Sequence, residues 1–238
     1  RNGITSIWAL PEKHGLFSVS QPQPIAVTTG PMNFYAPLPS TDGKKLYVLG
    51  EQPRGELVRY DPKSGQFVPI LSGISAQGVD YSRNGEWVAY VSYPDGTLWR
   101  CKADGSQRLQ LTFPPMRTAW PRWSPEGKRI AFTATSPSKP WKIHLISSDG
   151  GNPQEVLPTD RDESEPNWSP DGNLLVFGRN PFWEVGAHAE MAIEIVDLRT
   201  HEKSRLNGSE GLWSPRWSPD GHYISAYRPD STGLRLFD

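Results

Sequence analysis

The sequence Trp217-Ser218-Pro219-Asp220-Gly221 is the last of five related phrases that recur along this chain of 238 residues. In such a phrase, serine and aspartate or asparagine favour a turn by hydrogen bonding to the nearby backbone, and the closing glycine accepts a left-handed conformation. The closing glycines follow one another at intervals of 42 to 49 residues, which is typical of stacked structural repeats. The other four copies are Leu38–Gly43, Tyr81–Gly85, Trp123–Gly127 and Trp168–Gly172.

Each turn phrase introduces the same succession of short strands. An apolar run rich in β-branched and aromatic residues comes first, as in Leu174–Phe177, and predicts a strand buried on both faces. An alternating run such as Ile193–Val196 and a further short run such as Ser204–Leu206 complete the repeat. Four antiparallel strands, called A to D below, in every repeat are typical of propeller blades. The sequence therefore predicts an all-β fold, a β-propeller of four-stranded antiparallel blades.

We expect a single propeller domain over residues 1–238, with five blades visible. The chain begins and ends in mid-blade, so we expect residues 25–29 to complete the last blade and strands from both termini to close the ring. Ile4–Ala9 and Leu234–Phe237 both resemble the third strand of a blade, and a five-bladed ring closed by both termini needs only one of them. The alternative that this chain is part of a six- or seven-bladed propeller therefore remains. The predicted blades cover residues 34–71, 78–112, 119–157, 164–206 and 213–238.

The composition argues against several classes of function. A formal net charge of −1 and a pI near 6.6 lack the basic footprint of nucleic-acid binding. No apolar stretch reaches the length of a membrane-spanning helix, so membrane insertion is not expected. The single cysteine, Cys101, has no partner for an internal disulfide and is expected to be a small buried side chain.

The recurring Trp-Ser-Pro-Asp-Gly turn, with the apolar run after it such as Ile130–Phe132, resembles the WD-like repeats of TolB-type β-propellers. The resemblance covers Phe34–Asp238. The longer phrases Ile7–Leu10, Gly55–Tyr60 and Leu109–Pro115 resemble propeller domains appended to bacterial winged-helix regulators or serine/threonine kinases. This resemblance implies a non-catalytic sensor or interaction domain with a protein or peptide partner and no cofactor. It implies a bacterial source and leaves the periplasm and the cytoplasm both open.

Two kinds of enzyme remain as alternatives. Oligogalacturonate lyases resemble TolB-type propellers and hold a divalent metal on histidines, and His188 near Glu190 is the one close pair of histidine and carboxylate in this sequence. The second alternative is the gating propeller of a prolyl oligopeptidase-like hydrolase without its catalytic domain, since Gly73–Gln77 lacks the closing glycine of a nucleophile turn. We predict no catalytic residue and no metal site.

The long loops predict where binding occurs. In a propeller, the D-to-A and B-to-C loops share one face, here called the top face, and in this chain they include the long insertions Pro158–Glu165 and Gly178–Met191. Tryptophans without an equivalent in the other repeats lie in these loops beside charged residues, a combination typical of protein interfaces. The charged run Asp160–Glu165 is expected to be a solvated loop. The candidate binding residues are Arg117, Trp120, Arg161, Arg179, Trp183, Glu184, His188 and Trp213.

A purely structural role is a third interpretation. The strand Ile4–Ala9 is left without a partner by the predicted blades, and an unpaired strand can add to the edge of another chain's sheet. Self-association through this terminal strand is therefore an alternative to binding at the top face.

Overall fold

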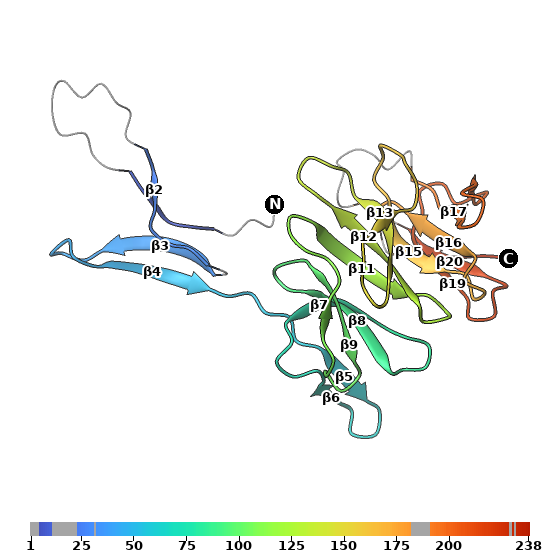
Figure 1. Cartoon of the computed structure of the whole chain (residues 1–238), viewed down its shortest axis with the longest axis horizontal. Coiled ribbons are helices and arrows are strands. Elements are labelled where there is room, and N and C mark those ends of the chain that lie inside the picture. The colour runs from blue at the N-terminus through green and yellow to red at the C-terminus, as the bar shows by residue number, and fades with distance from the viewer. Residues whose placement is uncertain (1–4, 11–22, 31, 182–190, 229, 231) are drawn as a thin grey trace. The chain divides into compact units, whose positions relative to one another are not determined.

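The computed structural model describes residues 5–10, 23–30, 32–181, 191–228, 230 and 232–238 (Figure 1). These residues form strands and turns, which confirms the prediction of an all-β fold. No helix in the described part of the chain is long and apolar enough to cross a membrane. The chain divides into two compact units, residues 1–54 and residues 55–238.

The first unit contains two antiparallel pairs of strands. β1 (Trp8–Ala9) pairs with β2 (Ile25–Ala26), and β3 (Asn33–Pro39) pairs with β4 (Leu46–Glu51). The backbone N–H of Phe34 donates to the carbonyl of Thr5 at 2.9 Å, which joins the two pairs. Because Ile25–Ala26 pairs with Trp8–Ala9 here, completion of the last blade by residues 25–29 stays a prediction.

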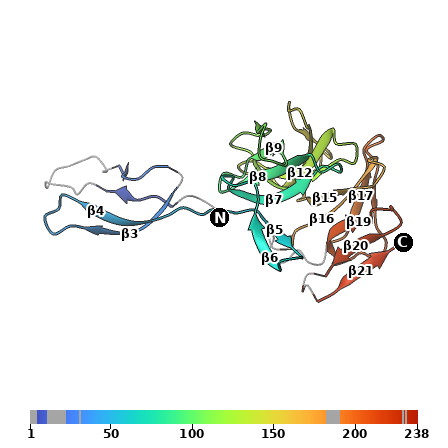
Figure 2. The same ribbon diagram turned by 90° about the horizontal axis from the view of Figure 1, so that it is seen from below.

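The second unit contains four propeller blades. Three antiparallel sheets have four strands each and a fourth has three, and the four sheets follow one another in chain order around an arc (Figure 2). A two-stranded sheet of β5 (Val58–Asp61) and β6 (Gln66–Pro69) precedes them.

The blades have the following bounds. The first consists of β7 (Ala76–Tyr81), β8 (Trp87–Ser92), β9 (Leu98–Lys102) and β10 (Leu109–Gln110). The second consists of β11 (Arg117–Trp123), β12 (Arg129–Thr135), β13 (Lys142–Ser147) and β14 (Gln154–Glu155). The third consists of β15 (Ser164–Trp168), β16 (Leu174–Gly178), β17 (Glu194–Asp197) and β18 (Lys203–Arg205). The fourth consists of β19 (Trp213–Trp217), β20 (Ile224–Tyr227) and β21 (Leu234–Phe237).

The prediction of five blades was wrong by one. The residues expected to form the blade 34–71 lie in two separate sheets, β3 with β4 in the first unit and β5 with β6 in the second. A propeller blade is stable because both of its faces are packed against neighbours. In these two hairpins apolar side chains remain exposed, 64% for Leu49 and 68% for Phe67. The turn phrase therefore specifies a hairpin, but it does not ensure that two hairpins join into one blade.

The serine of every turn phrase closes the turn between strands A and B. In the third blade, Ser169 Oγ accepts a hydrogen bond from the backbone N–H of Leu174 at 2.9 Å and donates to Asp171 Oδ1 at 2.6 Å. The N–H of Gly172, a residue with φ of +74°, donates to the carbonyl of Ser169 at 2.9 Å. All five serines accept from the backbone N–H five residues later: Ser40, Ser82, Ser124, Ser169 and Ser218.

The first strand of each blade contains a β-bulge. The pairing register shifts within β7, β11, β15 and β19, and in each strand a residue at the shift has a positive φ. These residues occupy the same place in their repeats: Gly78, Trp120, Glu165 and Ser214. A bulge changes the direction of the side chains that follow it. The four first strands contact one another in succession, β7 with β11, β11 with β15 and β15 with β19.

At two of the three junctions between blades, the side chain two residues after the bulge links one blade to the next. Asp80 Oδ2 accepts a hydrogen bond from the backbone N–H of Trp123 at 2.7 Å, and Asn167 Oδ1 accepts from the N–H of Trp217 at 2.8 Å. In the middle junction, Trp168 Nε1 donates to the carbonyl of Arg122 at 3.0 Å. The tryptophan of the turn phrase is thus held by the preceding blade as well as by its own.

The hydrophobic core lies between neighbouring blades. One buried cluster joins β8 and β9 to β11 and β12, and it includes Leu98, Trp123 and Phe132. The next cluster includes Trp168 and Phe177 and joins β12 and β13 to β15 and β16. The two tryptophans are each 6% exposed, as expected for side chains that pack between blades.

We expect the substitution Ser169→Ala to lower the free energy of unfolding by about 1–2 kcal/mol, because the N–H of Leu174 loses the buried hydroxyl that accepts its hydrogen bond. Urea denaturation followed by tryptophan fluorescence measures the change. Ser204→Ala in the exposed strand β18 is the matched control and should change the value by less than about 0.5 kcal/mol. Equal losses in the two variants would contradict a special role for the turn serine.

Asp80 should make the stability depend on pH. Burial raises the pKa of its carboxyl above the ordinary value of 3.8, while the N–H of Trp123 and the charge of Arg122 act in the opposite direction. The folded state therefore holds the Asp80 proton more tightly than the unfolded state does. The contribution of Asp80 to stability is complete below pH 3.8 and is lost as the pH rises through the raised pKa.

Asp80→Asn keeps an acceptor for the N–H of Trp123 and removes the ionisation, as Asn167 does at the equivalent place. We expect the free energy of unfolding of this variant, relative to that of the wild type, to increase as the pH rises from about 3 to 7. Urea denaturation at a series of pH values measures the difference. A difference that stays constant over this range would contradict the prediction.

Candidate functional site

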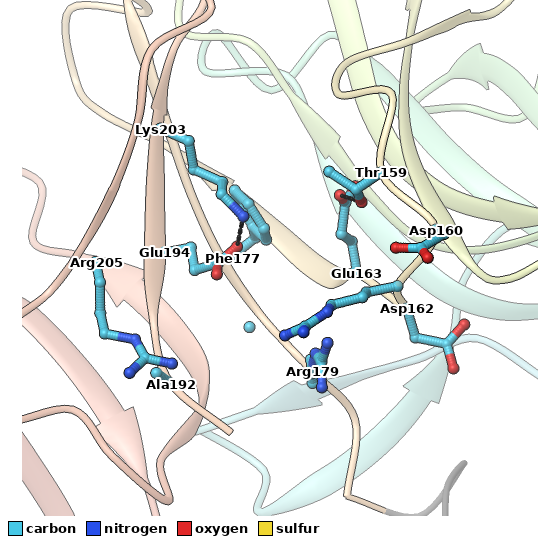
Figure 3. A pocket seen from close by; sticks show the side chains of 12 residues that line it. Thr159, Asp160, Asp162, Glu163, Phe177, Arg179, Ala192, Glu194, Lys203 and Arg205 are labelled. Atoms are coloured by element: carbon cyan, nitrogen blue, oxygen red, sulfur yellow. Dashed lines mark hydrogen bonds and ion pairs between the residues drawn. The ribbon is translucent and has the colours of Figure 1, made fainter. Parts of the chain in front are cut away.

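A pocket of about 230 Å³ lies beside the third blade, at the ends of the strands that are remote from the turn phrases (Figure 3). We call it the arginine pocket. One wall is the loop between β14 and β15, a D-to-A loop, and the others are the end of β16 and parts of β17 and β18. Its lining residues are Thr159, Asp160, Arg161, Asp162, Glu163, Phe177, Gly178, Arg179, Ala192, Glu194, Lys203 and Arg205.

Four carboxylates and four cationic side chains line the arginine pocket. Two of the carboxylates are already neutralised: Glu194 Oε2 lies 3.0 Å from Lys203 Nζ, and Glu163 forms an ion pair with Lys142, which lies outside the lining. Figure 3 shows the guanidinium groups of Arg179 and Arg205 turned toward the space between the walls. The other charged residues of the lining are Asp160, Arg161, Asp162, Arg179 and Arg205.

The loop wall is fixed by a buried ion pair. Lys142 and Glu163 are both buried, and Glu163 also accepts hydrogen bonds from Thr159 Oγ1 at 2.7 Å and from the backbone N–H of Ile143 at 3.3 Å. Lys142 also donates to Thr159 Oγ1. Removal of one partner from such a pair leaves an uncompensated buried charge, at a cost of about 3–5 kcal/mol. The loop is therefore held firmly against the start of β13.

The expectation that Asp160–Glu165 is a solvated loop was wrong for its last three residues, Glu163, Ser164 and Glu165, which are buried. Glu163 is paired with Lys142, and Glu165, which is 4% exposed, accepts hydrogen bonds from Ser214 Oγ and from Arg216 Nη2 at 3.0 Å. Their partners come from other strands, so a charge run read along the chain does not reveal that they are buried.

The structure brings Arg161 and Arg179 together among the lining residues of the arginine pocket. Trp183, Glu184 and His188 lie outside the described residues. Among the described ranges, no three His, Cys, Asp or Glu side chains gather as they would around a metal ion. The binding role of the five residues named here stays a prediction.

Three other candidates lie in strands, although the sequence analysis had placed them in loops. Arg117 and Trp120 belong to β11, and Trp213 is the first residue of β19. Trp120 also has equivalents in the other repeats, because it occupies the bulge. Trp213 Nε1 donates to the carbonyl of Arg228 at 3.2 Å. Their loop placement was wrong, because the first strands begin earlier than the turn phrase alone indicates.

Sequence reasoning missed Lys203 and Arg205. The two residues alternate along β18, so their side chains share one face of that strand. This alternation is visible in the sequence, but the short fourth strand gives no sign of which face lines a pocket.

No family model matches the chain. It is 27% identical over 154 residues to an uncharacterised protein of Agrobacterium fabrum, covering 59% of this chain and 53% of that protein. It is 27% identical over 117 residues to the uncharacterised peptidase YuxL of Bacillus subtilis, covering 45% of this chain and 18% of that protein. It is also 27% identical over 89 residues to the Tol-Pal system protein TolB of Alcanivorax borkumensis, covering 37% of this chain and 19% of that protein. The chain thus spans about half of the first of these relatives and less than a fifth of the other two.

Solved structures show the same likeness. A protein from Agrobacterium tumefaciens assigned as TolB has a TM-score of 0.60 at 18% identity, over 78% of this chain and 70% of that one. TolB from Acinetobacter baumannii has a TM-score of 0.53 at 18% identity, over 90% and 56%. A chain of a nidogen/laminin complex has a TM-score of 0.59 at 14% identity, over 99% and 86%. At these identities the likeness concerns the fold, and the fold of this chain is that of the TolB-like β-propellers.

Proposed function

We propose that this TolB-like propeller is a non-catalytic protein-interaction module that binds an acidic segment of its partner at the arginine pocket on the top face. The observation that carries the proposal is the position of Arg161, Arg179 and Arg205 around one small cavity on the face where long loops were expected to bind. Two of the carboxylates beside them are occupied by lysines.

The chemistry of the pocket favours a carboxylate. Guanidinium groups bind carboxylates through two parallel hydrogen bonds, and such charge-assisted bonds are about twice as strong as neutral ones. The volume of about 230 Å³ is below the range of about 300–1,000 Å³ that is usual for drug-sized ligands. One acidic side chain of a peptide fits this size better than a large small molecule does.

The rigid loop wall supports the same function. The ion pair of Lys142 with Glu163 holds residues 159–163 in place before any ligand binds. A preorganised site loses less conformational entropy on binding than a mobile one. One structural neighbour comes from a nidogen/laminin complex, which supports a protein as the kind of partner.

A fluorescein-labelled hexapeptide of alternating glutamate and glycine tests the proposal by fluorescence anisotropy at low ionic strength. We expect binding to the wild type and an affinity lower by about five-fold or more in Arg205→Gln, because the carboxylate loses a charged donor. Arg59→Gln, in the exposed β5, is the matched control and should bind as the wild type does. Absence of binding, or equal affinities in the two variants, would refute the proposal.

The propeller of a peptidase is the second candidate function. The match to the peptidase YuxL favours it, over 117 residues of this chain. The hexapeptide assay distinguishes the two candidates, because a gating propeller predicts equal affinity in Arg205→Gln and in Arg59→Gln. Release of nitroaniline from a panel of peptide nitroanilides by the chain alone would contradict the non-catalytic proposal.

A further inference from the structure

A second cavity lies at the opposite ends of the first strands, among the turn phrases. We call it the turn-face pocket; its volume is about 420 Å³. It is separate from the arginine pocket, because the two share no lining residue. Its lining residues come from the first strands and turns of all four blades: Asp80, Tyr81, Arg83, Arg122, Trp123, Ser124, Pro125, Asn167, Trp168, Pro170, Trp217, Ser218 and Pro219.

The repeat supplies an apolar wall to this pocket. Three consecutive blades each contribute a tryptophan and a proline from the same places of the turn phrase, and Tyr81 stands where the first blade has no tryptophan. Trp123 and Trp168 are each 6% exposed and present little surface to the pocket, so the apolar surface on which another ring can pack comes mostly from Trp217 and the prolines. The volume is within the range of about 300–1,000 Å³ for sites that hold small molecules.

Arg122 is the polar group that distinguishes this pocket. Burial lowers the pKa of its guanidinium and the charge of Arg216 acts in the same direction, whereas the charges of Asp80 and Glu165 act in the opposite direction. Among the described residues, Arg122 forms no ion pair, and the hydrogen bond that its guanidinium makes is to the carbonyl of Pro121 at 2.9 Å. The remaining donors of a poorly hydrated guanidinium are available to a ligand.

The acidic groups near Arg122 have other partners. Asp80 Oδ2 accepts from the backbone N–H of Trp123, and burial raises the pKa of this carboxyl. Glu165 is paired with Arg216 at 3.0 Å and bonded to Ser214. A carboxylate brought by a ligand would therefore accept from the guanidinium of Arg122 without displacing either contact.

We propose that the turn-face pocket binds a small organic acid with a flat apolar ring, whose carboxylate pairs with Arg122 while the ring packs on the tryptophans and prolines. This site is independent of the proposed peptide binding at the arginine pocket, and it gives the repeated turn residues a role in recognition as well as in folding.

Isothermal titration calorimetry on the whole chain tests the proposal with phenylacetate, indole-3-acetate and N-acetylproline, and with the neutral phenylacetamide as the matched probe. We expect at least one acid to bind, and phenylacetate to bind about ten-fold or more tightly than phenylacetamide. Arg122→Gln should reduce that preference to less than about three-fold. Arg59→Gln, in the exposed β5, is the control and should leave it unchanged. Loss of the preference in Arg205→Gln instead would place the acid in the arginine pocket and overturn the proposal for the turn-face pocket.

A second measurement does not depend on the folding of a variant. In NMR spectra of the wild-type chain, phenylacetate should shift the indole N–H signals of Trp123, Trp168 and Trp217 and leave that of Trp99, which is not part of the lining, in place. Failure of all three acids to bind, equal affinity for phenylacetamide, or shifts confined to other tryptophans would overturn the proposal.

Discussion

A hydrogen bond between the first strands of neighbouring blades is the contact on which the arrangement of the blades depends. A blade cannot bury both of its faces by itself, and each neighbour must be held at a fixed angle for the tryptophans to pack. Asp80 and Asn167 provide that link through the backbone N–H groups of Trp123 and Trp217. The apolar clusters between blades form around the tryptophans held in this way.

The same strands separate two kinds of surface. Their turn-phrase ends carry repeated residues, and these make a pocket with tryptophan and proline walls around Arg122. The other ends lead into loops that differ from blade to blade, and one of these loops forms a wall of the arginine pocket. The repeated turn residues thus give the turn-face pocket equivalent tryptophan and proline walls from several blades. The variable loop gives the arginine pocket charged side chains that have no equivalent in the other blades.

Much of the fold can be predicted from the sequence because the turn phrases are local. Ser169, Asp171 and Gly172 form their turn through contacts within six consecutive residues, so the local sequence is enough to predict the hairpin. Features that depend on distant partners could not be predicted. The burial of Glu163 requires Lys142, twenty-one residues away, and the turn phrase gives no sign that β3 with β4 and β5 with β6 form separate sheets. Arg161 and Arg179 were found as candidates because loops gather on one face, but the fourth-strand residue Arg205 carried no such signal.

The bulge of the first strands has a consequence for how such a ring evolves. One backbone position holds glycine, an aromatic ring, a carboxylic acid and a hydroxyl in four successive blades, at Gly78, Trp120, Glu165 and Ser214. A side chain other than glycine in this conformation costs about 1–3 kcal/mol, and the surrounding sheet sustains that strain in three of the four blades. The same backbone conformation therefore accepts chemically different side chains at this position, and each sector of the arc presents a different functional group there.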